Sequence, residues 1–283
     1  MEEFKLTAPA DIIPESHVAV FSPHYDDTLF LLGNCKLNWR EANIQKDIHV
    51  LLLFSRSNYL QGTGPNNFDA SLARIKLATG QRLLEDVSCL DELLGSFEYS
   101  YELFGEMECF ARGKKMADSE MEFPHGMFPD FQELDLQIFR RMKERIKKWA
   151  MREDTALVFP MAIKEHIDHF IVREAAMEAA RELGNSARAS FYFQEDKPYG
   201  GIATKEELER LSQFVTENPL TRRVYRAYPK QITDLAFKHY ISQVEEVYRT
   251  GIMGRAESLR QAVKAACPCD QLYVYYQSPS AKG

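Results

Sequence analysis

The sequence of 283 residues lacks long hydrophobic runs and has few cysteines. No stretch approaches the ~18 uncharged apolar residues that a membrane-spanning helix needs. Residues 1–16 are acidic and have no apolar core, so they are not typical of a signal peptide. The five cysteines are scattered and odd in number, which indicates reduced thiols rather than a disulfide framework. These absences favour a cytoplasmic protein with no membrane partner.

Excess positive charge is also lacking, because 35 Lys and Arg residues face 42 Asp and Glu residues, for a net charge of −7. A chain this acidic has no overall field that would hold a polyphosphate backbone, which argues against nucleic acid as a partner. The 45% of apolar residues is typical of a globular protein. No repeat and no linker rich in Pro, Gly or Ser divides the chain. We therefore expect a single domain over residues 1–283.

Short apolar runs, each followed by a helix-like segment, predict the core of the fold. The expected strands are 17–22, 48–54, 155–159 and 189–194, and the expected helices between or after them are 28–41, 69–86 and 170–183. The first two strands are continuously apolar, as expected of parallel strands covered on both faces. This pattern predicts an α/β fold, a Rossmann-like three-layer sandwich with a mostly parallel central sheet.

The remaining segments are expected to extend this core. Further helices are predicted at 131–151, 205–217 and 231–250, a late strand at 272–277, and an irregular insertion at about 97–130. Residues 230–283 form a C-terminal extension of helix and strand. Asp69 is the expected N-cap of its helix, and Gly184 is the expected C-cap of the helix that ends at residue 183.

Polar side chains follow three of the predicted strands. The three clusters are His24, Asp26 and Asp27; Ser55 and Arg56; and His166, Asp168 and His169. Ligands of open parallel sheets bind at the carboxyl ends of the strands. If these strands are neighbours, all three clusters converge on one crevice.

The residue types in this crevice suit a metal ion. His24 and Asp27 lie three positions apart at the start of a helix, and His166 and His169 have the same spacing. Two imidazoles and one carboxylate leave open positions on zinc, the pattern of a hydrolytic site. The same ligand set also suits non-haem Fe(II). Asp26 adjoins a ligand but points elsewhere, so it is a candidate base beside a metal-bound water.

Two of these motifs resemble signatures of a known enzyme family. Residues 22–27, SPHYDD, resemble the HxDD motif of the PIG-L (LmbE-like) de-N-acetylases, and residues 166–169, HIDH, resemble their HxDH motif. Residues 192–199, YFQEDKPY, resemble a segment that follows the fourth strand in some members, and residues 240–243, YISQ, resemble the late YxSQ element. The resemblance extends over about residues 17–245.

This resemblance implies a zinc-dependent hydrolase that removes the acetyl group from an N-acetylated sugar. His24, Asp27 and His169 would bind Zn²⁺, with Fe²⁺ or another divalent metal as the alternative. Asp26 would be the general base. The substrate would be a small-molecule conjugate of the N-acetylglucosamine type, and acetate would be released. Whether the protein forms a homo-oligomer is left open.

The resemblance also implies roles for residues around the metal ligands. His166 would be the general acid or oxyanion stabiliser, and Asp168 would orient its ring and raise its pKa. Arg74 falls where the family often has an arginine that contacts substrate, although a surface arginine on an amphipathic helix explains it equally well. Ser55, after the second strand, is a further candidate for substrate binding.

The chain departs from the family pattern at a few positions. Tyr25 stands where the family usually has Pro, so its ring is expected to narrow the pocket or stack on a sugar. Thr28 replaces the usual Glu, and a Gly-Gly pair is reduced to Gly33-Asn34. Leu77 stands where an acidic residue should follow three positions after the helix arginine. These changes bear on substrate identity more than on catalysis.

Two other functions fit the same residues. One is a zinc hydrolase of a different amide or of an ester. The other is a catalytically silent homologue that binds sugars or serves as a scaffold. A silent homologue usually loses ligands or base, whereas this chain keeps all of them.

Overall fold

The computed structural model describes residues 5–61, 69–114 and 128–275. Within these residues, seven strands form one sheet in the order β3-β2-β1-β4-β5-β7-β6. The strands are β1 (His17–Ser22), β2 (Asp47–Leu52), β3 (Tyr99–Leu103), β4 (Thr155–Pro160), β5 (Ser190–Gln194), β6 (Leu220–Arg226) and β7 (Cys269–Tyr275). The first five in this order pair in parallel, while β7 is antiparallel to both of its neighbours. The expected Rossmann-like α/β sandwich with a mostly parallel sheet is confirmed.

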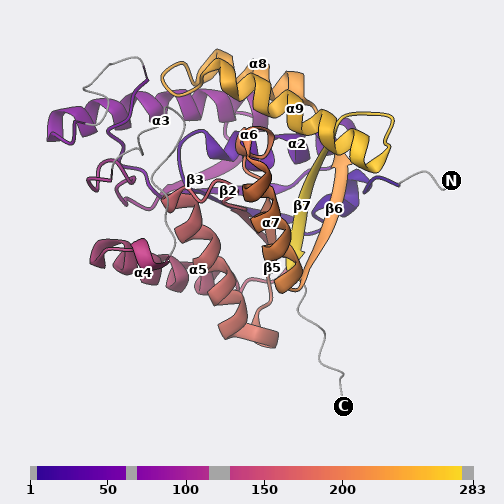
Figure 1. Cartoon of the computed structure of the whole chain (residues 1–283), viewed down its shortest axis with the longest axis horizontal. Helices are drawn as coiled ribbons and strands as arrows, with labels where there is room; N and C mark the ends of the chain where they lie inside the picture. The colour runs from indigo at the N-terminus through magenta and orange to yellow at the C-terminus, as the bar shows by residue number, and fades with distance from the viewer. Residues whose placement is uncertain (1–4, 62–68, 115–127, 276–283) are drawn as a thin grey trace.

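Helices cover both faces of this sheet (Figure 1). The longer ones are α2 (Asp27–Glu41), α3 (Leu72–Leu94), α4 (Glu133–Trp149), α5 (Ile167–Leu183), α7 (Lys205–Glu217), α8 (Pro229–His239) and α9 (Glu246–Val263), and the short ones are α1 (Pro9–Ile12) and α6 (Tyr199–Ile202). One hydrophobic core lies between the sheet and α4 and α5, and a second lies between the sheet and α2, α3 and α8. The sheet is therefore the middle layer of three.

The centre of the sheet brings the polar strand ends together. β1 pairs with β2 on one side and with β4 on the other, and all three run in the same direction. Five of the six residues of β1 and all six of β4 are buried, so both strands are fixed by packing on two faces. The segments that leave β1 and β4 therefore emerge side by side at the carboxyl ends of these central strands.

Several boundaries differ from the sequence expectation. The helix predicted to start after Asp69 begins at Leu72, because the Ser71 hydroxyl caps it by accepting the backbone N–H of Arg74. This helix runs on to Leu94, since its later residues continue to bury an apolar face. Gly184 is the C-cap of α5, as predicted. The helix predicted over 231–250 is two helices, α8 and α9, separated by residues 240–245.

Two strands at the edges of the sheet were not predicted. β3 lies inside the segment 97–130 that was expected to be irregular, and residues 115–127 of that segment lie outside the described residues. β6 carries four charged or polar positions among its seven residues. The predicted late strand is β7, which begins three residues earlier than expected, and residues 276 and 277 lie outside the described residues.

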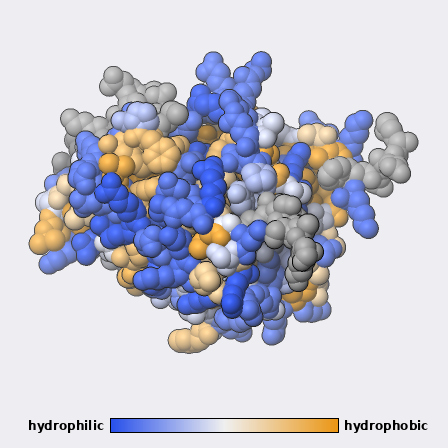
Figure 2. Space-filling view, turned by 90° about the horizontal axis from the view of Figure 1, so that it is seen from below, coloured by the Kyte–Doolittle hydropathy of each residue, from blue (hydrophilic) through white to orange (hydrophobic). Residues whose placement is uncertain are grey.

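Figure 2 shows one face on which hydrophilic residues predominate and hydrophobic ones form small areas between them. Among the described residues, the helices are all too short or too polar to cross a membrane.

Candidate metal centre and active site

The two loops that leave β1 and β4 carry the motifs singled out in the sequence. His24 lies in the turn after β1, where the Ser22 hydroxyl donates a hydrogen bond to its carbonyl at 2.9 Å. Asp27 is the first residue of α2. His166 is the N-cap of α5, and His169 lies in the first turn of that helix. The structure therefore brings the HxDD and HxDH motifs together at the carboxyl ends of the central strands, as the sequence predicts.

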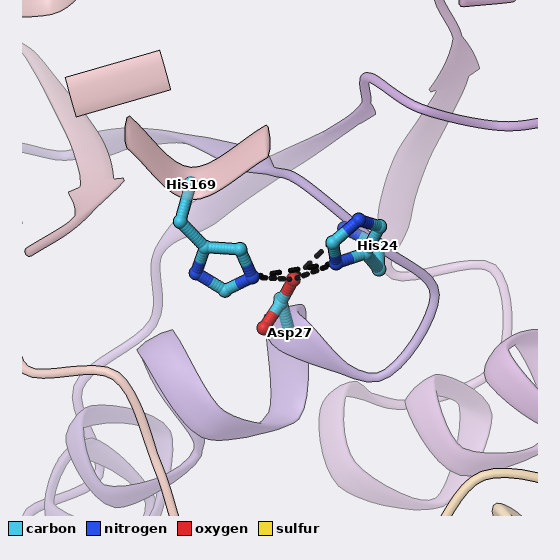
Figure 3. A group of neighbouring side chains, drawn as sticks. All are labelled: His24, Asp27 and His169. Carbon is cyan, nitrogen blue, oxygen red and sulfur yellow. Dashed lines mark hydrogen bonds and ion pairs between the residues drawn. The ribbon is translucent and has the colours of Figure 1, made fainter. Parts of the chain in front are cut away.

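Three side-chain atoms of these motifs converge on one point (Figure 3). His24 Nδ1 lies 3.3 Å from Asp27 Oδ2, His169 Nε2 lies 3.2 Å from the same oxygen, and the two nitrogens are 3.3 Å apart. All three residues are buried. Two imidazoles and one carboxylate thus form a nearly equilateral triangle of donor atoms.

This triangle has the dimensions of a tetrahedral metal site. Zinc bonds of about 2.0–2.1 Å to nitrogen and oxygen place tetrahedral ligand atoms about 3.3–3.4 Å apart. The three measured edges of 3.2 and 3.3 Å match this spacing. Three protein ligands also leave a fourth position for water or substrate, as in catalytic zinc sites. His24, Asp27 and His169 therefore fit a divalent metal.

The Asp168 carboxylate sets the orientation of the His24 ring. Asp168 Oδ2 lies 2.9 Å from His24 Nε2, and the same oxygen accepts the Cys109 backbone N–H at 2.9 Å. Although burial opposes it, the neighbouring Arg112 and His24 hold the pKa of Asp168 below its usual range. Because an ionised carboxylate only accepts hydrogen bonds, His24 Nε2 carries the proton. His24 Nδ1 is then the nitrogen that faces Asp27 and His169, which is the arrangement a metal ligand requires.

Asp168 contacts both histidines. Its carboxylate bonds the imidazole of His24, and its backbone N–H donates to His166 Nδ1 at 3.2 Å. The charge of Asp168 raises the pKa of His166, as expected, but burial, together with the charges of His24 and His169, outweighs it and lowers that pKa well below 6.5. The ring of His166 is thus neutral at neutral pH. Since its Nδ1 accepts a hydrogen bond, its Nε2 carries the proton.

The ligand imidazoles hold protons when no metal is bound. Burial disfavours the charged form of His24, but Asp168 and Asp27 outweigh it and raise its pKa to about 9. The pKa of His169 is raised well above 6.5 against the same burial, by Asp27 and by Asp196, whose Oδ1 lies 3.7 Å from His169 Nδ1. A site that attracts two protons attracts a divalent cation for the same electrostatic reason.

Asp26 is buried beside the ligands without joining their triangle. Burial, and next the charge of Asp27, raise the pKa of Asp26 to about 6. Arg82 on α3 is a neighbouring cation, and its Nη2 lies 3.9 Å from Asp26 Oδ1. A carboxylate with a pKa this close to neutral is suited to accept a proton and return it.

A pocket opens above these residues. The pocket is small and partly open to solvent. Its polar lining includes His24, Asp26, Asp27, His166, Arg82, Glu108 and Gln243. Its aromatic lining consists of Tyr59, Phe110, Tyr199 and Tyr248. The rings of Tyr59 and Phe110 lie 6.0 Å apart.

The three residues expected to bind substrate are not among those that line this pocket. Tyr25 is fully buried, and its hydroxyl donates to the Ser55 carbonyl at 2.6 Å. The Ser55 hydroxyl accepts the backbone N–H of Gly105 at 2.9 Å. Arg74 Nε donates to the Asn58 carbonyl at 2.9 Å. Tyr25 and Ser55 therefore hold the loops beneath the site, and Arg74 holds the loop beside it.

The arginine of α3 that lies in the pocket is Arg82, two turns after Arg74. Glu85 follows Arg82 by three positions on the same helix. The sequence analysis did not single out Arg82, although the spacing of Arg82 and Glu85 is visible in the chain.

Solved structures with a similar fold include three deacetylases. The zinc-inhibited form of teicoplanin deacetylase Orf2 has 18% identity and a TM-score of 0.60, over 94% of this chain and 100% of that one. The A40926 pseudoaglycone deacetylase Dbv21 has 16% identity and a TM-score of 0.56, over 94% and 100%. The N,N'-diacetylchitobiose deacetylase of Pyrococcus horikoshii has 12% identity and a TM-score of 0.52, over 98% and 91%. The chain shares the fold of these deacetylases.

The similarity is one of structure. The sequence matches no protein-family model and has no match among curated proteins. At identities of only 12–18%, the structural similarity shows a common fold over almost the whole chain and no more. The case for function therefore rests on the geometry of the site.

Proposed function

We propose that this protein is a metal-dependent de-N-acetylase of the PIG-L (LmbE-like) type, which removes the acetyl group from an N-acetylated sugar conjugate. The observation that carries the proposal is the triangle of His24 Nδ1, Asp27 Oδ2 and His169 Nε2, with edges of 3.2–3.3 Å beneath a pocket. The fold shared with three deacetylases supports it. Zn²⁺ is the metal we propose, and Fe²⁺ would suit the same ligands.

The residues around the triangle supply the proton transfers of amide hydrolysis. His24, Asp27 and His169 would hold a divalent metal, which would supply Lewis-acid chemistry for water and for the amide carbonyl. Asp26, with a pKa of about 6, takes the proton of the attacking water. His166 donates its Nε2 proton in a hydrogen bond to the oxygen that becomes negative. Asp26 then returns its proton to the leaving amine, and acetate and the free amine are released.

The lining of the pocket supports a sugar as the part of the substrate beyond the amide. Aromatic residues, among them Tyr248, line the pocket, and an aromatic face suits the C–H face of a pyranose. The Arg82 guanidinium supplies a hydrogen-bond donor for a hydroxyl in the same pocket. Three deacetylases of the same fold act, by their names, on teicoplanin, on the A40926 pseudoaglycone and on N,N'-diacetylchitobiose.

Acetate release from purified protein tests the proposal. The protein is stripped of metal with a chelator, reloaded with Zn²⁺ or Fe²⁺, and incubated with N-acetylglucosamine and a panel of its glycosides. We expect acetate only from the reloaded protein, in amounts equal to the free amine formed. His169→Ala, measured beside it, should lose both the metal and the activity.

The panel also separates the other two functions. A hydrolase of another amide or of an ester would leave the N-acetyl sugars intact and would cleave N-formyl, longer N-acyl or O-acetyl analogues. A silent sugar-binding homologue would bind one metal and the sugars while releasing nothing. Either result would contradict the proposal.

A further inference from the structure

Gln243 lies between α8 and α9, 161 positions from Arg82 in sequence, yet its side chain contacts the Arg82 guanidinium. Gln243 Oε1 accepts a hydrogen bond from Arg82 Nε at 2.7 Å, and Gln243 Nε2 donates to Glu85 Oε2 at 2.9 Å. All three side chains are buried. One amide therefore connects an arginine of the pocket with a glutamate one helical turn further along α3.

Glu85 is in turn held by the residue before Gln243. The Ser242 hydroxyl donates to Glu85 Oε2 at 2.7 Å, and the Ser242 backbone N–H donates to Oε1 at 3.2 Å. Two residues earlier, the Tyr240 hydroxyl donates to Asp86 Oδ1 at 2.7 Å. These contacts fix the segment 240–243 against α3, so the Gln243 amide has a defined position.

The hydrogen bonds of Arg82 leave one edge of its guanidinium for the pocket. Nη1 donates to Ser57 Oγ at 2.6 Å and to Glu108 Oε2 at 2.7 Å, while Nε donates to Gln243. Nη2 makes no hydrogen bond to any side chain or carbonyl within the described ranges, and it lies 3.9 Å from Asp26 Oδ1. The N–H groups of Nη2 can therefore donate to a bound ligand.

We propose that Gln243, held by Glu85, is a positioning residue that keeps the Nη2 edge of Arg82 turned toward the pocket, where it binds an oxygen of the substrate. The inference rests on the proposed deacetylase function. Rotation about the last bonds of the arginine side chain is opposed at Nε by Gln243 and at Nη1 by Ser57 and Glu108. Loss of the acceptor at Nε would let the planar group turn, and a displacement of about 1 Å is enough to weaken a positioned contact.

A swap of the two interacting side chains tests this directly. Gln243→Glu places a second carboxylate beside Glu85 and removes the bond between them. Adding Glu85→Gln restores an amide donor and a carboxylate acceptor in reversed order, and the new carboxylate at position 243 can still accept from Arg82. The Ser242 hydroxyl can then accept from the new amide, so the swapped pair keeps every contact. Gln243→Ala removes both hydrogen bonds of the Gln243 side chain. If the alanine variant does not fold, Gln243→Met is used in its place, because methionine has a similar length and lacks the amide.

Steady-state kinetics on the N-acetyl sugar that the wild type cleaves should show a change in KM. We expect Gln243→Ala and Gln243→Glu to raise KM about tenfold or more while kcat changes less than about threefold, because a contact kept in both ground and transition states is lost. The double variant should return KM to within about threefold of the wild type. Gln81→Ala is the matched control, since Gln81 Nε2 donates to Glu85 Oε1 at 3.2 Å, whereas the side-chain hydrogen bonds of Arg82 go to Gln243, Ser57 and Glu108. Metal content and melting temperature are measured for all variants.

Crystal structures of the same variants give a result that does not depend on activity. The Arg82 guanidinium should move in Gln243→Ala and return in the double variant. An unmoved guanidinium, an unchanged KM in folded Gln243→Ala, or a double variant no better than Gln243→Glu would overturn the inference. A wild type that cleaves no N-acetyl sugar, with a guanidinium that moves as expected, would contradict the proposed function and leave the positioning intact.

Discussion

Asp168 offers a direct test of how the metal site is built. Its Oδ2 accepts hydrogen bonds from His24 Nε2 and from the Cys109 backbone N–H, each at 2.9 Å, and its Oδ1 accepts from Arg112 Nη2 at 2.7 Å. In Asp168→Asn, one of the two carboxylate oxygens becomes an NH₂ group, which cannot accept from His24 and Cys109 on one side or from Arg112 on the other. The side chain can therefore keep only one of these two sets of hydrogen bonds, and the His24 ring is less firmly held with Nδ1 toward the metal. Loss of such a partner of a metal-binding histidine costs about 10- to 100-fold in affinity, or about 1.4–2.8 kcal/mol.

The assay is a competition titration of Zn²⁺ against a chromogenic chelator. Asp135→Asn is the matched control, because Asp135 is also buried and accepts from Arg112 Nε at 3.0 Å, but it does not contact His24. We expect a 10- to 100-fold weaker Kd for Asp168→Asn and less than about a threefold change for Asp135→Asn. Equal losses in both variants would mean that Arg112 and general packing set the affinity. An unchanged Kd for Asp168→Asn would refute the assigned orientation of His24.

Three further outcomes follow from the buried charges. Asp26→Asn should keep one equivalent of metal in elemental analysis and lose about 10²–10⁴ in kcat, the usual contribution of a general base; loss of the metal would show that Asp26 is a ligand. Because the pKa values of His24 and His169 are raised to about 9 and well above 6.5, zinc binding at pH 7 should release about two protons in calorimetry across buffers of different ionisation enthalpy, and release of none would contradict the assigned ligands. Burial raises the pKa of Asp86 to about 8, so the native state keeps a proton that the unfolded state loses above about pH 4, and stability should fall by up to about 1.4 kcal/mol per pH unit between these values. Asp86→Asn should flatten that slope in denaturant titrations, and an unchanged slope would assign it to other groups.

The centre of the fold and the metal donors could be predicted because local patterns determine them. β1 and β4 are continuous apolar runs, since both of their faces are covered, and each is followed directly by its motif. The spacing of His24 to Asp27 and of His166 to His169 is visible in the chain itself. Neighbouring parallel strands then bring the two motifs together without any further information.

The parts that were missed depend on position at an edge or on contacts between distant residues. β3 and β6 are the outermost strands, and their partly exposed sequences lack the apolar signal of a central strand. The bond from Asp168 to His24 joins residues 144 positions apart, so the spacing within HIDH suggested His166 as the partner instead. Arg82 was overlooked because its place in the pocket depends on contacts with Glu108 and Gln243, which lie far from it in sequence.

The central claim is that one metal held by His24, Asp27 and His169 supports hydrolysis of an N-acetyl group. The most direct measurement adds Zn²⁺ in known equivalents to metal-free protein and follows acetate release from an N-acetyl sugar at each step. The account predicts a linear rise that ends at one equivalent, and no rise for His169→Ala under the same conditions. A rate of acetate release that is already at its maximum without added Zn²⁺, or that does not change with the amount of Zn²⁺ added, would contradict the account.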